Sequence, residues 1–231
     1  LQTGDYAPAL ELLEVMADIH RRKPTPMSKW YLALMRSAYV VEAPDWQKAN
    51  MVIDMQGVEL SATACDLFAR GLAAIRKDTT GAERTLQQLR ALRADAERKI
   101  DGTSHNHSSY FEGVYSSSIR AVRIIETQLE ALVLLADGHS ERAVERLKDA
   151  VAAEDRLATG YGPPLPVKPS TELLGEVLLN LARWEEAQNV FQQSLQRTPR
   201  RTASLVGFEH LYKDGLVAIV NGCGYEKNHK Y

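Results

Sequence analysis

Apolar side chains recur along this chain every three or four residues, the spacing that gathers them on one face of an α-helix. The pattern is clearest between Pro169 and Pro199, where two apolar stripes are separated by a turn at Ala182-Arg183. The stripes consist of Leu173, Leu174, Val177, Leu178 and Leu181, then Ala187, Val190, Phe191, Ser194 and Leu195. Residues 169–198 are therefore predicted to form two antiparallel helices.

The same stretch carries small residues where two helices would touch. Gly175 lies in the first predicted helix, and Ala187 and Ser194 lie in the second. Small side chains let helix backbones approach closely, and Phe191 is expected to wedge between the two helices. Pro199 cannot continue a helix and is expected to end the pair.

Stripes of the same kind predict further helix pairs, so the predicted fold class is all-α. We expect complete pairs over residues 26–57, 61–100, 113–155 and 169–198, and partial ones over residues 1–22 and 200–231. The polar segment 101–109 is expected to be a loop, and the proline-rich segment 161–169 an extended connector.

Two details of the first complete pair can be predicted from local signals. Thr25-Pro26 is typical of a helix start, with Thr as the capping residue and Pro in the first turn. The turn at residues 44–46 is expected to lead into a short second helix that carries Met51, Val52 and Met55.

Residues 141–203 resemble a known repeat family. Gly175, Ala187, Phe191, Ser194 and Pro199 stand at the intervals of the tetratricopeptide repeat, a helix-turn-helix unit of about 34 residues. The matching small alanines at 9, 49, 82, 143 and 187 are 40, 33, 61 and 44 residues apart, so the chain resembles an irregular, bacterial-type variant. The resemblance implies one right-handed α-solenoid domain over residues 1–231. It also implies a non-enzymatic role in binding peptides or partner helices along a concave face.

The composition agrees with close-packed helices. It gives no electrostatic reason to expect nucleic acid or an anionic membrane as a partner. Hydrophobic residues make up 45% of the chain and aromatic residues only 7%. The 28 basic and 30 acidic residues nearly cancel, so nucleic acid and anionic membranes are not expected as partners. No apolar run approaches the ~20 residues that a membrane-spanning helix needs. The sequence does not indicate a cellular compartment.

The two cysteines are far apart in the sequence. Cys65 falls within a predicted packed helix, and Cys223 lies near the end of the chain. We interpret Cys65 as a small buried core residue rather than as half of a disulfide.

Six polar residues are predicted to face the concave groove and bind a charged peptide. Helical spacing places each group of three on one helix face. The two groups are Arg120, Arg123 and Gln128, and Glu172, Glu176 and Asn180. A solvated helix face is the alternative interpretation of these residues.

One well-known use of the repeat does not fit this sequence. Repeats that hold the C-terminal carboxylate of chaperones use Lys and Asn at successive concave positions. The matching positions here are Gln128, Leu132, Glu172 and Glu176, whose acidic and apolar groups would not attract a carboxylate.

Metal binding and catalysis have little support in the sequence. His105 and His107 offer two imidazoles, with Asp101 and His139 as further candidate ligands, but a flexible polar loop is the simpler interpretation. No nucleophile motif of the Gly-x-Ser-x-Gly kind and no phosphate-binding glycine loop is present. No cofactor is predicted, and the protein is not expected to be an enzyme.

The leading functional prediction is a scaffold whose concave groove binds a protein segment. One alternative is self-association, through apolar helix faces that incomplete terminal repeats would expose. Another is an accessory protein that uses the His105/His107 loop for a metal or small ligand.

Overall fold

The computed structural model describes residues 4–49, 51–77, 80–102, 109–157, 165–197, 201–207 and 209. All regular structure within these residues is helical, which confirms the all-α prediction. The helices are α1 (Ala7–Arg22), α2 (Pro26–Glu42), the 3-10 helix η1 (Trp46–Ala49), α3 (Leu60–Ile75), α4 (Thr80–Gly102), α5 (Ser109–Ala136), α6 (Ser140–Glu154), α7 (Ser170–Asn180) and α8 (Trp184–Arg197). Residues 202–207 are also helical.

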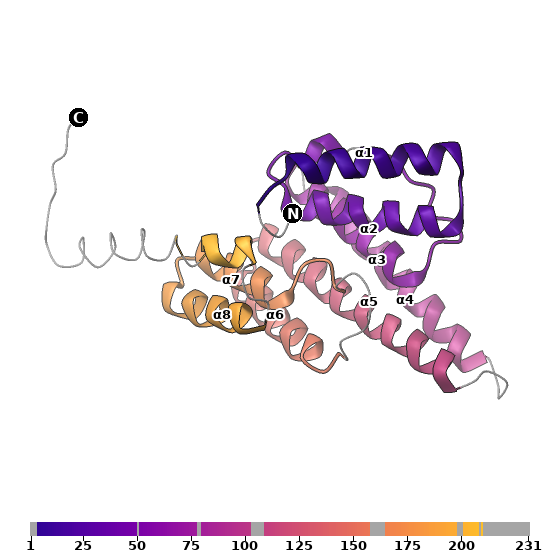
Figure 1. The fold of residues 1–231 in the computed structure, drawn as a ribbon. Helices are drawn as coiled ribbons and strands as arrows, with labels where there is room; N and C mark the ends of the chain where they lie inside the picture. The colour runs from indigo at the N-terminus through magenta and orange to yellow at the C-terminus, as the bar shows by residue number, and fades with distance from the viewer. Residues whose placement is uncertain are drawn as a thin grey trace, which may run out of the picture. The chain divides into compact units, whose positions relative to one another are not determined.

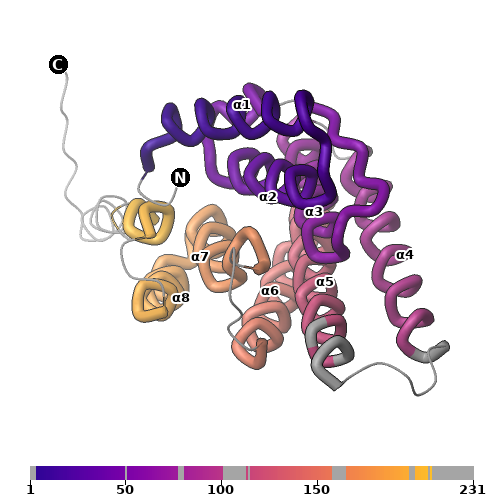
Figure 2. The backbone as a smooth tube through the Cα atoms, turned by 45° about the vertical axis from the view of Figure 1, so that its right-hand side comes forward, coloured from indigo at the N-terminus to yellow at the C-terminus, as the bar shows by residue number. Residues whose placement is uncertain are grey.

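The chain divides into two compact units. Of the described residues, those between 5 and 170 form the first unit, and those between 171 and 209 form the second together with Gly4. Most helices in the first unit pack against their neighbours in sequence (Figures 1 and 2). The main exception is α3, which contacts α5 as well as α2 and α4, and α1 also touches η1. This contact is close, because a Cβ atom added to Gly71 on α3 would lie only 2.6 Å from Cδ1 of Leu129 on α5.

The link between α1 and α2 follows the predicted start signal. Thr25 Oγ1 accepts a hydrogen bond from the Ser28 backbone N–H at 3.0 Å, and Ser28 Oγ accepts one from the Thr25 backbone N–H at 3.0 Å. The Ser28 hydroxyl also lies 2.8 Å from Nδ1 of His20 on α1. A capping box therefore starts α2 and joins it to the last turn of α1.

The predicted second helix through Met51, Val52 and Met55 is wrong. After η1 the described residues from 51 to 55 have no helical structure, and the Val52 side chain is fully exposed. Asp54 Oδ1 instead accepts the Gln56 backbone N–H at 3.0 Å, a local turn that competes with helix formation. Helix α2 packs against α1 and against α3, the next α-helix in the chain (Figure 1).

Ion pairs connect α4, α5 and α6 along their surface. Arg93 of α4 donates from Nε to Glu126 of α5 at 2.7 Å, and Arg90 lies 3.3 Å from Glu130. Glu130 in turn accepts from Arg146 of α6 at 2.6 Å. The three helices therefore share a continuous row of alternating charges, which we call the α4–α6 ion-pair row.

The second unit is built around one aromatic ring. Phe191 of α8 is fully buried. A Cβ atom added to Gly175 on α7 would lie 2.8 Å from its ring, and one added to Gly207 would lie 2.4 Å away. The predicted wedge between two helices is confirmed, and the segment 202–207 packs against the same ring.

The turns that end α5 and α7 have the same hydrogen bonds. His139 N–H bonds to Leu134 O at 2.8 Å and Gly138 N–H to Leu135 O at 3.1 Å. The matching pair runs from Arg183 to Leu178 at 2.9 Å and from Ala182 to Leu179 at 3.0 Å. Both are Schellman turns, and both place one residue in the left-handed region, Gly138 at φ 83° and Ala182 at φ 56°. The turns are 44 residues apart, the interval already noted between Ala143 and Ala187.

The backbone of Ala182 adopts a left-handed conformation that favours glycine. Ala182→Gly is therefore expected to stabilise its helix pair. We expect the free energy of unfolding to rise by about 0.5–1 kcal/mol in the variant, because relief of strain exceeds the added chain entropy. The matched change Gly138→Ala should lower stability by about 1 kcal/mol. Urea unfolding, monitored by hydrogen exchange in α5–α8, measures both changes. Destabilisation by Ala182→Gly would contradict the interpretation.

Cys65 is a buried free thiol in α3, as predicted. Burial raises the pKa of this thiol from 9.0 to about 12, and burial together with the Asp45 hydrogen bond raises the pKa of Tyr39 from 10.0 to about 12. Both groups are therefore held neutral in the fold while the unfolded chain loses their protons.

The free energy of unfolding should consequently be unaffected by these two groups below pH 9 and should fall as pH rises towards 12. Each group contributes a slope of up to about 1.4 kcal/mol per pH unit. Urea unfolding at several pH values tests this, and Cys65→Ala should make the decline shallower. An unchanged slope in that variant would show that the thiol does not contribute.

Candidate functional site

A cavity of about 380 Å³ lies within the first unit, between α2, η1 and α3. Its apolar wall includes Val40 of α2, Ala73 of α3 and the non-helical residues Met51, Val52 and Ile53. The cavity therefore lies beside the segment that was predicted to be a helix and is not one. We call it the α2–α3 cavity.

The charged residues that line the α2–α3 cavity are mostly basic. Asp66 of α3 accepts from Arg36 of α2 at 2.6 Å and lies 2.6 Å from Arg70 of α3. Lys77 follows α3 and places its ammonium group 5.4 Å from the centre of the Trp46 ring. Three cations and one carboxylate leave the lining with an excess of two positive charges.

Arg36 is the only buried cation among these groups, at 8% exposed, whereas Arg70 and Lys77 are exposed. Its Nε has no hydrogen-bond partner among the described residues. Burial lowers the pKa of Arg36, although the neighbouring carboxylate of Asp66 opposes that shift. A buried cation whose donors are incompletely used favours a nearby anion.

The helices around the cavity are joined by contacts of Arg76, which is not itself part of the cavity lining. The Arg76 guanidinium donates to the backbone oxygens of Val40 at 2.7 Å and Val41 at 3.2 Å, near the end of α2. The same guanidinium lies 5.7 Å from the Trp46 ring. These contacts connect α2, η1 and the end of α3 before any ligand enters.

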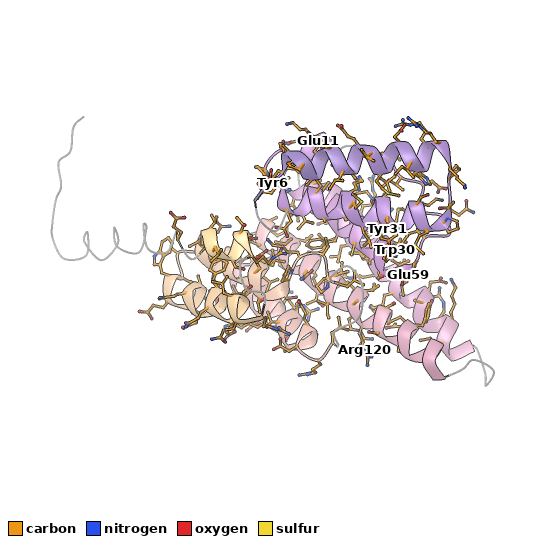
Figure 3. The ribbon with its side chains drawn as sticks, viewed as in Figure 1. Tyr6, Glu11, Trp30, Tyr31, Glu59 and Arg120 are labelled. Carbon is orange, nitrogen blue, oxygen red and sulfur yellow. The ribbon has the colours of Figure 1, made fainter. Side chains whose placement is uncertain are left out.

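The predicted residues of the first unit do not form one exposed surface. Arg120 and Arg123 are exposed on α5, where Arg123 donates to Glu97 at 2.7 Å (Figure 3 labels Arg120). Gln128 is fully buried, and its Nε2 donates to Lys168 O at 2.7 Å and Ser170 Oγ at 2.9 Å. Gln128 is therefore a packing residue rather than a residue open to a peptide.

The predicted residues of the second unit also separate. Asn180 is exposed and Glu176 is half-buried, but Glu172 is fully buried. Glu172 accepts from Arg201 Nε at 2.7 Å and from Ser204 Oγ at 2.8 Å. The expectation that Glu172 presents a charge to a groove is incorrect, because the start of the 202–207 helix covers it.

The sequence interpretation missed the residues of the α2–α3 cavity. One signal was present, since Arg36 and Asp66 are charged residues set among the apolar positions of helices predicted to be packed. A charge on a buried helix face requires a partner. Two such charges of opposite sign on neighbouring helices can therefore be predicted to form an ion pair.

Other predicted features lie outside the described residues or give a limited result. His105 and His107, proposed as weak metal ligands, are not among the described residues, and neither is Cys223. Within the described residues, no cluster of three or more His, Cys, Asp or Glu side chains could hold a metal ion. Across that same part of the chain, each helix is too short or too polar to cross a membrane.

Comparison with known proteins gives no assignment. No protein-family model matches the sequence, no curated protein matches it, and no solved structure matches the fold.

The buried pair of Glu172 and Arg201 gives a direct stability prediction. Glu172→Gln leaves a buried guanidinium without its carboxylate and should cost about 3–5 kcal/mol of unfolding free energy in the second unit. Asn180→Ala, an exposed change on the same helix, should stay within about 0.5 kcal/mol of the parent. Hydrogen exchange in α7 and α8 measures both.

A double variant controls for loss of packing at this site. Glu172→Leu combined with Arg201→Met removes both charges and should recover most of the lost stability. If Glu172→Gln were as stable as the parent, the ion pair would not be what anchors residues 202–207.

Proposed function

We propose that this protein is a non-catalytic binding module built from tetratricopeptide-like repeats. Its α2–α3 cavity would receive an acidic side chain from an extended segment of a partner protein. The observation that carries this proposal is the positively charged, largely apolar cavity around Arg36.

The proposed architecture is a right-handed α-solenoid. Support comes from the matching turns at Gly138 and Ala182 and from the fully buried alanines Ala143 and Ala187, each five residues after its turn residue. Consecutive helix pairs with the same internal geometry are the basis of a repeat stack, in which each repeat contacts only its neighbours.

The cavity suits a carboxylate next to an apolar group. Guanidinium groups bind carboxylates through two parallel hydrogen bonds, and Arg36 and Arg70 are both placed at the lining. Met51, Val52 and Ile53 would contact the apolar part of the same ligand. A volume of about 380 Å³ is in the range of small-ligand pockets and accommodates one or two side chains rather than a folded surface.

The groups in the cavity are suited to binding rather than to proton transfer. Its titratable lining consists of arginine, lysine and an aspartate that is ion-paired on two sides. Guanidinium and ammonium groups keep their charge at neutral pH and hold anions without exchanging protons.

Paired peptides test the proposal. We would measure fluorescence anisotropy for labelled, end-blocked peptides that carry Asp or Glu between Leu, Ile or Phe residues, against the same peptides with Asn or Gln. The acidic peptides should bind at least about tenfold more tightly, and the difference should shrink as salt is added.

A matched pair of variants locates the site. Arg70→Gln removes a cavity cation and should weaken acidic-peptide binding about 5- to 10-fold. Lys48→Gln removes an exposed cation from η1, outside the cavity lining, and should leave binding unchanged. Equal affinity for acidic and amide peptides, or equal losses in the two variants, would refute the cavity as the binding site.

A further inference from the structure

The outward face of α1 carries an apolar stripe. Leu12, Val15 and Ile19 are spaced at i, i+3 and i+7, so they lie on one side of the helix. Their exposed fractions are 60%, 55% and 49%, whereas Leu13 of the same helix is buried. A row of large exposed apolar side chains on one helix is typical of a surface that is covered by another molecule.

The charges of α1 and the residue after it are arranged in two blocks. Glu11, Glu14 and Asp18 come first, and Arg21, Arg22 and Lys23 follow. At 100° per residue, Glu11 and Arg22 lie on the same edge of the apolar stripe, near opposite ends of the helix. Figure 3 labels Glu11 in the N-terminal half of α1.

We propose that two copies of this chain associate through α1, packed antiparallel about a two-fold axis. Such an axis keeps each edge of the stripe on its own side and reverses the helix direction. It therefore sets Glu11 of one copy opposite Arg22 of the other, twice in the interface. The side chains of the two stripes then alternate along the contact.

The charge pattern favours a second copy of α1 as the partner and an antiparallel arrangement of the two helices. A parallel pair would bring the acidic blocks together and the basic blocks together, which disfavours that arrangement. Asp18 already pairs with Arg22 at 2.7 Å within one chain, but the Arg22 side chain is 79% exposed and retains donors for a second carboxylate.

The contact is small, so the dimer should be weak. A helix of 16 residues is about 24 Å long, and a single helix pair buries less than the roughly 800 Å² per partner of a standard interface. We expect a dissociation constant on the order of 10–100 µM. The association involves α1 and is independent of ligand binding in the α2–α3 cavity.

Sedimentation equilibrium of the full chain over a range of concentrations tests the proposal. The parent should show a concentration-dependent mass between monomer and dimer. Val15→Glu places a charge in the middle of the stripe and should abolish the dimer, while its circular dichroism stays that of the parent because the site is exposed.

Charge reversals test the direction of pairing. Glu11→Arg should weaken the dimer about 3- to 10-fold, and adding Arg22→Glu in the same chain should restore much of the affinity. Glu14→Arg is the matched control, because Glu14 is an exposed glutamate on the side of α1 turned away from the stripe. That variant should dimerise like the parent.

Several results would overturn the proposal. A parent chain that remains monomeric at several hundred micromolar would do so. A dimer that survives Val15→Glu would place the interface elsewhere. Loss of affinity in the Glu11→Arg/Arg22→Glu double variant equal to or greater than that in Glu11→Arg would exclude antiparallel pairing.

Discussion

The structure depends on one recurring constraint, which is that a polar side chain buried at a helix contact must find a partner on the segment that covers it. Gln128 and Glu172 occupy corresponding positions, ten residues before Gly138 and Ala182. Gln128 donates to the chain around the first residue of α7, and Glu172 binds Arg201 and Ser204 around the next helical segment. In both cases a buried polar side chain forms hydrogen bonds with residues next to the start of a later helical segment.

Helices and their boundaries could be predicted from the sequence wherever local signals agreed. The turn at Ala182-Arg183 and the wedge at Phe191 follow from two apolar stripes with small residues between them. The start at Thr25-Pro26 follows from capping chemistry alone. The prediction for the segment after Trp46 was wrong because its apolar residues fit a helix, while the structure has a turn in which Asp54 accepts the Gln56 backbone N–H.

The candidate site could not be predicted in the same way. Helical periodicity shows that Glu172 and Glu176 share a face, but it does not show which neighbouring segment covers that face. Arg201 lies 29 residues further along the chain, and its contact with Glu172 becomes visible only in three dimensions. The α2–α3 cavity is harder still to foresee, because it exists where an expected helix fails to form. The sequence signal for it was the pair of opposite charges at Arg36 and Asp66.

The α4–α6 ion-pair row has a consequence for behaviour at elevated temperature. Glu126 is largely shielded from solvent, while Arg90 and Arg146 remain about half exposed. The hydration free energy of charged groups becomes less favourable as temperature rises. Removing such groups from water therefore costs less free energy at high temperature. Helices α4, α5 and α6 are therefore held together by contacts whose relative contribution grows on warming, while hydrophobic stabilisation per unit area levels off. High salt acts in the opposite direction, so heat and salt should have contrasting effects on this row of charges.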